Sequence, residues 1–434
     1  MKQEISICWF RRDLRLDDNT ALYHALQSPY PVLPVFIFDP EILGRLPDKN
    51  DRRISFIYHT LQDLNRRCLE HGSSFYVTFD RVEDAFKKFF EEFEVKAVFI
   101  NHDYEPYAIN RDQSIQKLSE AEGAAFYTFK DQVIFERSEI IKTDGSPYTV
   151  FTPYSNKWRQ MFNQHPLKEF PSEKYLSKLL KSRAYDFPSL ANLGFQEVDP
   201  EVMPANIEEV TISSYQDTRN LPSIAGTSQV SPYLRFGTLS IRHLVKLAFK
   251  WNATWLNELI WREFFMMILY QFPHVVNQNF KRKYDNIPWR NNENEFELWC
   301  KGETGYPIID AGMRQLNETG WMHNRVRMIV AGFLTKHLLI DWRWGEAYFA
   351  QKLLDYELSS NNGNWQWAAG SGCDSAPYFR IFNPTSQTKK FDPKLTYIKT
   401  WIKDFNKYHL PPIVDHEFAR RRALDVYKKA LSEE

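Results

Sequence analysis

The chain has 434 residues, of which 43% are hydrophobic and 25% are charged, and its formal net charge is zero. This composition is typical of a folded globular protein and excludes a disordered or fibrous chain, while the length predicts two domains or one large one. Zero net charge excludes a protein that coats nucleic acid by bulk electrostatics, although it is compatible with a local basic groove.

The sequence indicates neither a membrane span nor a metal site. No apolar run approaches the roughly 20 residues that a transmembrane helix requires, and the first ten residues have the composition of a strand rather than of a leader. We therefore expect a cytoplasmic monomer without membrane contact. The four cysteines, at positions 8, 68, 300 and 373, show no CxxC spacing, so neither a disulfide framework nor a metal is expected.

Short runs of β-branched and aromatic residues alternate with amphipathic stretches over residues 1–135. The runs are ISICWF, YPVLPVFIFD, SSFYVTFD, VKAVFINHD and AAFYTFKDQVIF, and the amphipathic stretches lie at 52–71, 82–94 and 107–121. This alternation predicts a doubly wound, Rossmann-like α/β domain whose parallel sheet is covered by helices on both faces. No GxGxxG motif follows the first run, so ordinary dinucleotide binding is not predicted there.

The rest of the chain changes character twice. Pro, Ser and Lys accumulate between 136 and 205, which predicts an inter-domain linker with short helices. From 206 to 434 the apolar periodicity predicts an all-α domain, with helices at 239–251, 253–272, 306–318, 321–340, 344–357 and 415–431. Of 13 tryptophans, all but Trp9 and Trp158 lie between Trp251 and Trp401, which suits either a large helical core or a functional use.

Polar residues precede or interrupt several of these helices. In GTSQVSPYLRFG (226–237), the hydroxyls of Thr227, Ser228 and Ser231 suit a phosphate group, but a plain helix cap is the simpler interpretation. In WLNELIWREFFMMILY (255–270), Glu258 and Trp261 fall on one helical face. That face is either a buried surface with an i,i+4 Glu–Arg pair or a floor for a planar polar ligand.

Two further stretches carry charged residues close to aromatic ones. In GWMHNRVRMIVAGFL (320–334), Asn324, Arg327 and Met328 share a helical face, whereas Arg325 points elsewhere. In LLDYELSSNNGNWQW, Asp355 could form a buried pair with an arginine of another element, although such a pair alone is weak evidence for function. The following NNGNWQWAAGSG (361–372) is expected to form an extended or turning loop, in which the two tryptophans could be a plain packing pair.

Seven segments in their order and spacing resemble the photolyase/cryptochrome flavoprotein family, and most closely the class I cyclobutane pyrimidine dimer photolyases. They are CWFRRDLRLDDN, GTSQVSPYLRFG, NELIWREF, GYPIIDAGMRQLNETGWMHNRVRM, LLIDW, NNGNWQW and APYFRIFNPTSQTKKFDP. The resemblance covers essentially the whole chain and implies an antenna-type α/β domain followed by a helical FAD-binding domain. It implies a light-dependent carbon–carbon lyase that splits dimers in UV-damaged double-stranded DNA with an electron from excited FADH⁻.

The resemblance also implies an FAD site. The residues matching positions around the phosphates and the ribityl chain are Tyr215, Thr227, Ser228 and Ser231, and those around the ring systems are Arg262, Asn324, Arg327, Asp355, Glu357 and Asn361. Asn361 matches the position that faces flavin N5, where plant-type cryptochromes carry Asp, so it favours repair over signalling. Glu357 stands where the family usually has Asp.

Electron transfer and lesion binding are assigned by the same resemblance. The chain of indoles from the flavin to the surface matches Trp365, Trp342 and Trp289. The lesion pocket matches Glu258, Trp261, Trp367, Asn324 and Met328, and the arginines beside the lesion match Arg219, Arg325 and Arg380. The 6-4 photolyases carry histidine at the positions of Asn324 and Met328, and members that prefer single strands tend to carry tyrosine for both pocket tryptophans. We therefore expect cyclobutane dimers in duplex DNA as the substrate.

An antenna chromophore and two other functions remain open at this stage. Folate-binding members tend to carry glutamate where this chain has Ala108, so folate is not expected, while a deazaflavin, a second flavin or an empty site are all compatible with the sequence. A photosensory cryptochrome is disfavoured by Asn361 and by the short segment after Trp401. A light-independent flavoprotein electron carrier would have no use for Glu258 beside two tryptophans.

Overall fold

A computed structural model describes residues 2–200 and 202–432. The described residues form two compact units, neither of which is continuous in the chain. One unit takes the described parts of Met1–Glu139, Trp158–Ala205 and Val230–Leu247, and the other takes those of Ile140–Lys157, Asn206–Gln229 and Ala248–Glu434. The units therefore differ from the predicted division at 135 and 205, since most of the segment expected to be a linker packs with the first unit.

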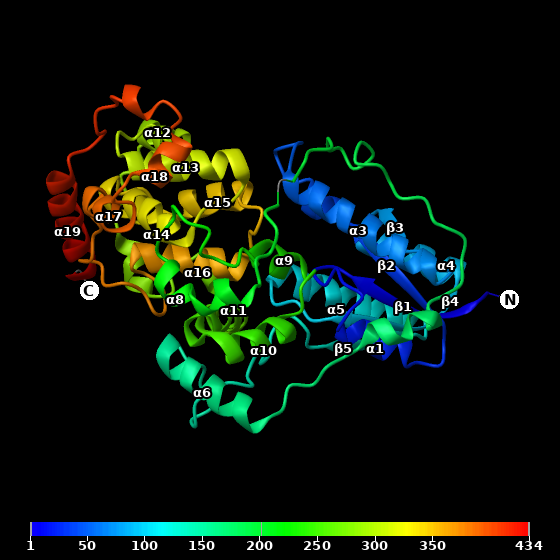
Figure 1. Cartoon of the computed structure of the whole chain (residues 1–434). Coiled ribbons are helices and arrows are strands. Elements are labelled where there is room, and N and C mark those ends of the chain that lie inside the picture. Colours follow the sequence, from blue (N-terminus) through cyan, green and yellow to red (C-terminus); the bar gives the residue numbers. More distant parts are fainter. Residues whose placement is uncertain (1, 201, 433–434) are drawn as a thin grey trace. The chain divides into compact units, whose positions relative to one another are not determined.

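The first unit contains a five-stranded parallel sheet in the order β3-β2-β1-β4-β5 (Figure 1). The strands are β1 (Glu4–Phe10), β2 (Val32–Phe38), β3 (Tyr76–Phe79), β4 (Glu94–Asn101) and β5 (Ala125–Phe129). Each coincides with one of the five predicted apolar runs, although β1 and β4 begin one residue before theirs. Every residue of β2 and all but the first of β1 are buried, as expected for a sheet covered on both faces.

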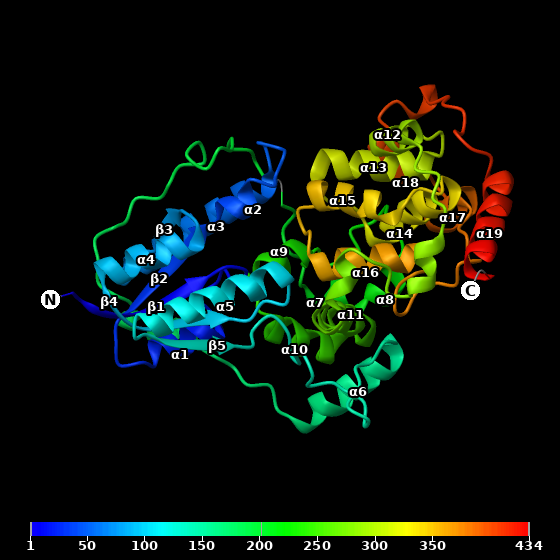
Figure 2. The ribbon, with the colours of Figure 1, turned by 180° about the vertical axis from the view of Figure 1, so that it is seen from behind.

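Alternate residues of β1 serve the two faces of this sheet. Cys8 and Phe10 pack in one apolar cluster with α1 (Thr20–Leu26) and α3 (Arg52–Glu70). Ile7 and Trp9 pack in another with α4 (Val82–Glu92) and α5 (Pro106–Ala121). The predicted doubly wound α/β architecture is confirmed (Figures 1 and 2).

Buried ion pairs attach later segments of the chain to the loop after β1. Asp131 accepts from Arg15 at 2.7 Å and from Arg242 at 2.9 Å, and its side chain is fully buried. Burial alone would raise the pKa of Asp131, but the two guanidinium groups hold that pKa well below its ordinary value. Because Arg242 lies in α10 (Ile241–Trp251), this cluster explains why residues 230–247 belong to the sheet-containing unit.

The second unit is helical, as predicted. Its longer helices are α11 (Ala253–Gln271), α12 (Glu293–Lys301), α13 (Pro307–Thr319), α14 (Asn324–Gly332), α15 (Trp342–Lys352), α16 (Leu358–Ala369), α17 (Pro384–Phe391) and α19 (His416–Ser432). The short helices of the chain are α2 (Pro40–Leu43), α7 (Glu209–Ser213), α8 (Tyr215–Thr218), α9 (Ser231–Phe236) and α18 (Thr396–Trp401), and α6 (Phe151–Gln164) has residues in both units. Among the described residues, no helix is long and apolar enough to span a membrane.

Two helix boundaries differ from the predicted ones because of caps. The helix expected at 321–340 begins only at Asn324, since the His323 ring accepts a hydrogen bond from the Arg325 backbone at 3.1 Å and thereby caps it. It continues after Gly332 as a π-helical turn, Phe333–His337. The helix expected at 344–357 ends at Lys352, and residues 353–357 form a connection to α16.

The expectation of a loop at 361–372 is wrong, because most of this segment lies in α16. The Glu357 carboxylate caps the helix by accepting from the backbone amides of Ser359 and Ser360, and Gly370 ends it with a φ of 92°. The inward face of α16 carries the amides of Asn362 and Gln366 beside Trp365, and all three side chains are buried. Since four of the seven buried residues of α16 are polar, the segment lacks the apolar periodicity by which a helix is predicted.

Candidate functional site

The predicted site residues converge on one pocket of the helical unit. Its empty volume is about 620 Å³, and it lies among α14, α16, the end of α15 and the connection 353–357. Eight of the predicted residues line it: Asn324, Arg327, Met328, Asp355, Glu357, Asn361, Trp365 and Trp367. Residues predicted to bind a flavin and residues predicted to bind a damaged base therefore share a single cavity.

An ion pair forms part of the pocket wall. Arg327 Nη2 lies 2.8 Å from Asp355 Oδ2, Arg327 Nη1 lies 3.2 Å from Oδ1, and Arg327 Nε donates to the Met322 carbonyl at 2.7 Å. The Asp355 side chain is only 3% exposed, whereas that of Arg327 is 25% exposed. The two-point contact fixes the guanidinium plane, so a positive charge of defined orientation faces the cavity.

Glu357 uses its carboxylate to hold the start of α16. Besides the two backbone amides, the hydroxyls of Ser359 and Ser360 donate to it at 2.6 and 2.8 Å. These four contacts tie the carboxylate to the first turn of α16, which follows Glu357 directly.

Asn361 is oriented by a residue that the sequence analysis missed. Its Nδ2 donates to Glu346 Oε1 at 2.8 Å and to the Glu346 carbonyl at 3.1 Å, so the amide oxygen is the atom left for the pocket. Burial raises the pKa of Glu346, and the hydrogen bond from Asn361 partly opposes that rise. No local signal marks Glu346, which lies on α15 in an unremarkable WRWGEAYF stretch.

The three tryptophans assigned to electron transfer are graded in exposure. Trp365 and Trp342 are 2% and 1% exposed, respectively, and Trp289 is half-buried at the edge of the same apolar cluster. The indole nitrogen of Trp342 donates to Asn279 at 2.9 Å. A fourth indole, Trp299, was not predicted, yet its ring centroid lies 6.2 Å from that of Trp365.

Glu258 is paired with an arginine far away in sequence rather than with its helical neighbour. Arg219 Nη1 lies 2.5 Å from Glu258 Oε1, and the guanidinium also lies over the Tyr215 ring at 5.5 Å. The expected i,i+4 partner of Glu258 was Arg262, whereas the observed partner is Arg219. Burial raises the pKa of Glu258, while the charge of Arg219 opposes the rise.

The remaining predicted residues lie on several elements. Trp261 and Arg262 are half-buried on α11, and Ser228 Oγ accepts from the Trp255 indole at 3.0 Å. Thr227 is half-buried, and Ser231 is exposed at the first position of α9, in the other unit. No side-chain hydrogen bond caps α9, so a plain cap does not account for the hydroxyls of this segment.

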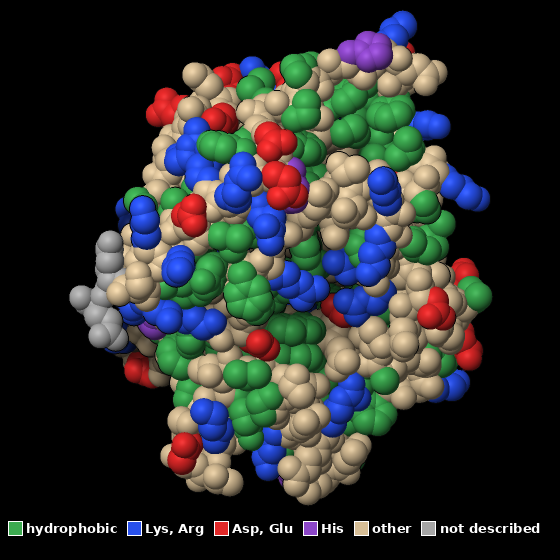
Figure 3. Space-filling view, turned by 90° about the vertical axis from the view of Figure 1, so that its left-hand side faces the viewer, with side chains coloured by type: hydrophobic (Ala, Val, Ile, Leu, Met, Phe, Trp, Pro, Cys, Tyr) green, Lys and Arg blue, Asp and Glu red, His purple; other side chains and the backbone are tan. Residues whose placement is uncertain are grey.

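The three predicted arginines form one local cluster of positive charge. Arg325 donates to Asn220 Oδ1 at 2.6 Å, and its guanidinium lies over Phe391 at 4.4 Å. Burial lowers the pKa of Arg325, and the charges of Arg219 and Arg380 lower it further, so both of these arginines lie within electrostatic range of Arg325. Figure 3 shows Lys and Arg side chains gathered on one face of the helical unit.

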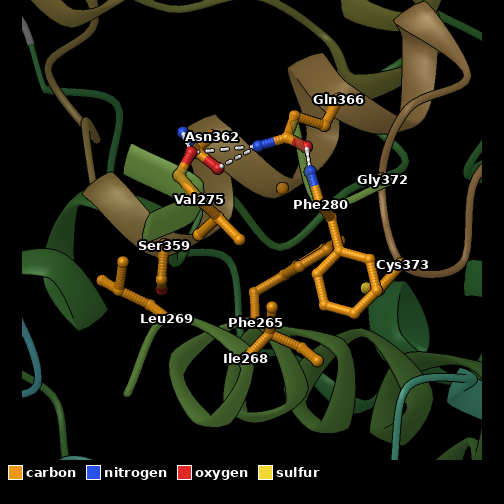
Figure 4. Close-up of a pocket in the computed structure, with 11 residues that line it drawn as sticks. Phe265, Ile268, Leu269, Val275, Phe280, Ser359, Asn362, Gln366, Gly372 and Cys373 are labelled. Carbon is orange, nitrogen blue, oxygen red and sulfur yellow. Dashed lines mark hydrogen bonds between the residues drawn. The ribbon is translucent and has the colours of Figure 1, made fainter. Parts of the chain in front are cut away.

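A second pocket, of about 300 Å³, lies on the other side of α16 and is lined mainly by apolar residues. Figure 4 shows how it satisfies the polar residues of that helix. Gln366 Nε2 donates to the Val275 carbonyl at 3.0 Å and to Asn362 Oδ1 at 3.0 Å, while its Oε1 accepts from the Phe280 amide at 2.8 Å. These contacts fix α16 rotationally, so that Trp365 and Trp367 face the first pocket.

Comparisons with known proteins match the chain along almost its whole length. A family model described as DNA photolyase matches residues 6–173, and one described as the FAD binding domain of DNA photolyase matches residues 255–411. A curated deoxyribodipyrimidine photo-lyase of Alkalihalophilus pseudofirmus is 35% identical, with 97% of each chain covered.

Two solved structures are similar in fold and in sequence. A class III photolyase from Agrobacterium tumefaciens has a TM-score of 0.86 and 32% identity, covering 99% of this chain and 98% of that one. An archaeal photolyase from Sulfolobus tokodaii, whose structure holds two FAD molecules, has a TM-score of 0.85 and 35% identity, covering 98% and 100%.

Proposed function

We propose that this chain, which belongs to the DNA photolyase family, splits cyclobutane pyrimidine dimers in duplex DNA in a light-dependent reaction that uses reduced FAD. The observation that carries the proposal is the shared pocket. Groups suited to a reduced flavin and groups suited to an extruded base line the same cavity, so an electron would cross a short distance between them. The protein acts as a monomer in the cytoplasm.

The pocket fits the ring system of FAD. The Arg327 guanidinium, held by Asp355, compensates negative charge on a reduced ring, and the Asn361 oxygen can accept a hydrogen bond from a ring N–H. When bound, FAD supplies the light absorption and the electron, which no amino-acid side chain could supply. Asn361 cannot act as a proton source as an aspartic acid can, which favours repair over signalling.

Lesion binding requires a change of partners at Glu258. In the DNA-free protein its carboxylate is neutralised by Arg219, at 2.5 Å. A phosphate that recruits Arg219 would leave Glu258 with a raised pKa, so its carboxyl group could hold a proton and donate a hydrogen bond to a pyrimidine carbonyl. Trp261 and Trp367 provide the surfaces for stacking, which is worth roughly 1–3 kcal/mol per base.

The arginine cluster supplies the contacts to the DNA backbone. The charges of Arg219 and Arg380 both act on Arg325, so the three guanidinium groups concentrate positive charge locally although the whole chain is neutral, and Glu258 offsets one of them. Phosphates are the natural partners of such a cluster, and they position the duplex without reading its sequence.

The experiment that tests the proposal follows dimer reversal directly. The reduced protein is mixed with duplex DNA containing one cyclobutane thymine dimer and exposed to blue light, with a dark sample as control. We expect the absorbance of intact thymine to return only in the light. If the absorbance stays unchanged while the flavin is demonstrably reduced, the repair assignment is wrong. Extraction of bound chromophores from the same preparation shows whether a second one accompanies FAD.

A further inference from the structure

Phe151, the first residue of α6, lies face to face on Trp261. The ring centroids are 3.7 Å apart and the planes differ by 4°, which is the closest ring stacking described in the chain. For comparison, Phe162 and Trp158 on the same helix stack with centroids 5.0 Å apart at 8°. One face of the Trp261 indole is therefore covered by a second aromatic ring.

Phe151 is itself fixed by contacts on two sides. Its backbone N–H donates to Asp374 Oδ2 at 2.8 Å, and its ring meets Phe264 edge-on at 5.9 Å. One turn later, Tyr154 OH donates to Glu263 Oε1 at 3.3 Å. Both Glu263 and Phe264 belong to α11, so the first turn of α6 is anchored to the helix that carries Trp261.

The contact with Asp374 links this arrangement to the second pocket tryptophan. Asp374 lies in the segment that follows α16, seven residues after Trp367 on that helix. Phe151 thus contacts Trp261 through its ring and the α16 side of the pocket through its backbone. Trp261 remains half-buried despite the stacking, so part of its surface stays open to a ligand.

We propose that Phe151 is a positioning residue for lesion recognition, a role that rests on the proposed function. By stacking behind Trp261, Phe151 holds the indole in one orientation before DNA binds. Its backbone hydrogen bond to Asp374 keeps the position of that indole fixed relative to Trp367. An extruded pyrimidine then stacks on a surface that needs no ordering on binding. Ordering a side chain only on binding would weaken affinity for the damaged base, because its conformational freedom is lost in the complex.

The proposal predicts a selective loss of affinity. In the dark, Phe151→Leu should weaken binding of a duplex with one cyclobutane thymine dimer by about tenfold. Binding of the identical undamaged duplex, which depends on phosphate contacts, should change less than twofold. Phe151→Tyr, which keeps the flat ring, should restore discrimination. The measurement is the Kd for the undamaged duplex divided by the Kd for the damaged duplex, determined for the FAD-loaded full chain. FAD content and Tm are recorded for each variant.

Matched variants separate positioning from packing. Phe162→Leu removes the other Phe–Trp stack of α6 and should leave the Kd ratio unchanged. In a Trp261→Leu background, Phe151→Leu should have little further effect on the ratio, because its target is already gone. If Phe151→Leu does not fold, Phe151→Met takes its place, because its flexible unbranched side chain can fill the gap without offering a flat face, and it should lower the ratio likewise.

The outcomes also distinguish this inference from the proposed function. If the unaltered protein binds both duplexes equally, the repair function itself is contradicted. If it discriminates between them but Phe151→Leu or Phe151→Met preserves the ratio, only the role of Phe151 is refuted. If Phe151→Leu weakens binding of both duplexes equally, or if its effect adds to that of Trp261→Leu, then Phe151 serves packing alone.

Discussion

The amide of Asn361 could point either of its two heavy atoms into the pocket, and Glu346 selects the oxygen. The selection works because the carboxylate and the backbone carbonyl of Glu346 are both acceptors, which only the Asn361 nitrogen can satisfy. A residue on α15 thus decides which group a bound flavin would meet on α16.

We predict that Glu346→Gln weakens this selection. The glutamine side chain can donate as well as accept, so the Asn361 amide is no longer held in one orientation. The hydrogen bond from a flavin N–H to the Asn361 oxygen, worth about 1 kcal/mol, is then lost whenever the amide turns over. Repair by pre-reduced protein should fall several-fold, and air oxidation of the reduced flavin should accelerate while FAD content is retained. Unchanged oxidation kinetics would contradict the role given to Glu346.

The path by which electrons reach the flavin also depends on single residues. The family resemblance assigns the step after Trp365 to Trp342, whereas the nearest indole ring described for Trp365 is that of Trp299. Both are fully buried, so burial does not distinguish them. Trp299 donates its indole N–H to the Val330 carbonyl at 3.2 Å and Trp342 donates to the Asn279 amide oxygen at 2.9 Å.

We predict that Trp342→Phe slows photoreduction of the oxidised flavin at least tenfold, while Trp299→Phe, the matched control, slows it less than twofold. The reason is that the family resemblance assigns the step after Trp342 to the half-buried Trp289, where solvent can stabilise the oxidised indole. Repair by protein reduced in advance should be nearly normal in both variants. The reverse order of the two effects, followed by flavin absorbance under blue light, would assign the electron path to Trp299.

At the level of elements, the sequence predicted those strands and helices that consist mainly of apolar residues. The strands were predicted because each is an apolar run in a sheet covered on both faces. The helix α11 was predicted because it is long and largely apolar, and α13 because apolar residues recur along it at helical spacing. The helix α16 was missed because its buried face carries Asn362 and Gln366, whose amides are satisfied by a segment about 90 residues earlier. Partners so distant in the chain cannot be inferred from the neighbouring residues of the sequence.

The site shows the same limit. Its residues were identified through the family resemblance. The charges alone indicated only that Asp355 could pair with an arginine of another element, and the structure shows that this arginine is Arg327. The partner of Glu258 was not predicted, since Arg219 is 39 positions away and Arg262 offered a closer alternative. Phe151, Glu346 and Trp299 act through contacts between elements, and none belongs to a motif.

The cap of α14 makes the site sensitive to pH. Only a neutral His323 can accept from the Arg325 amide, and burial together with nearby guanidinium groups lowers the pKa of His323 to about 4 from an ordinary 6.5. In the unfolded chain the ring gains its proton near pH 6.5, but in the folded chain only near pH 4. Stability is therefore complete above pH 6.5 and falls as the pH drops through this window.

We predict that His323→Asn removes this part of the pH dependence. Asparagine caps helices well and does not titrate. Between pH 7 and pH 4.5 the natural chain should lose up to about 3 kcal/mol more unfolding free energy than the variant, at about 1.4 kcal/mol per pKa unit. The measurement is chemical denaturation at several pH values. Parallel curves for the two proteins would show that His323 is not the responsible group.

For the whole molecule, 55 basic and 55 acidic residues cancel, so any attraction to DNA must come from how the charges are distributed. Some of the described surface cations are paired, as Arg66 is with Asp63 at 3.0 Å on the sheet-containing unit. In the cluster of Arg219, Arg325 and Arg380, Arg219 is paired with Glu258, but the charges of Arg219 and Arg380 still lower the pKa of Arg325. Affinity for duplex DNA should accordingly be local in origin and sensitive to salt.

We therefore predict that the exposed Arg380 contributes one phosphate contact. Arg380→Ala should weaken binding of damaged and undamaged duplex by similar factors and reduce the slope of log K against log salt concentration by about one. Arg66→Ala, which removes the same charge far from the cluster in sequence and on the other unit, should leave the slope unchanged. Equal slope changes for both variants would mean that net charge governs binding, whereas a loss confined to the damaged duplex would place Arg380 at the base rather than at the backbone.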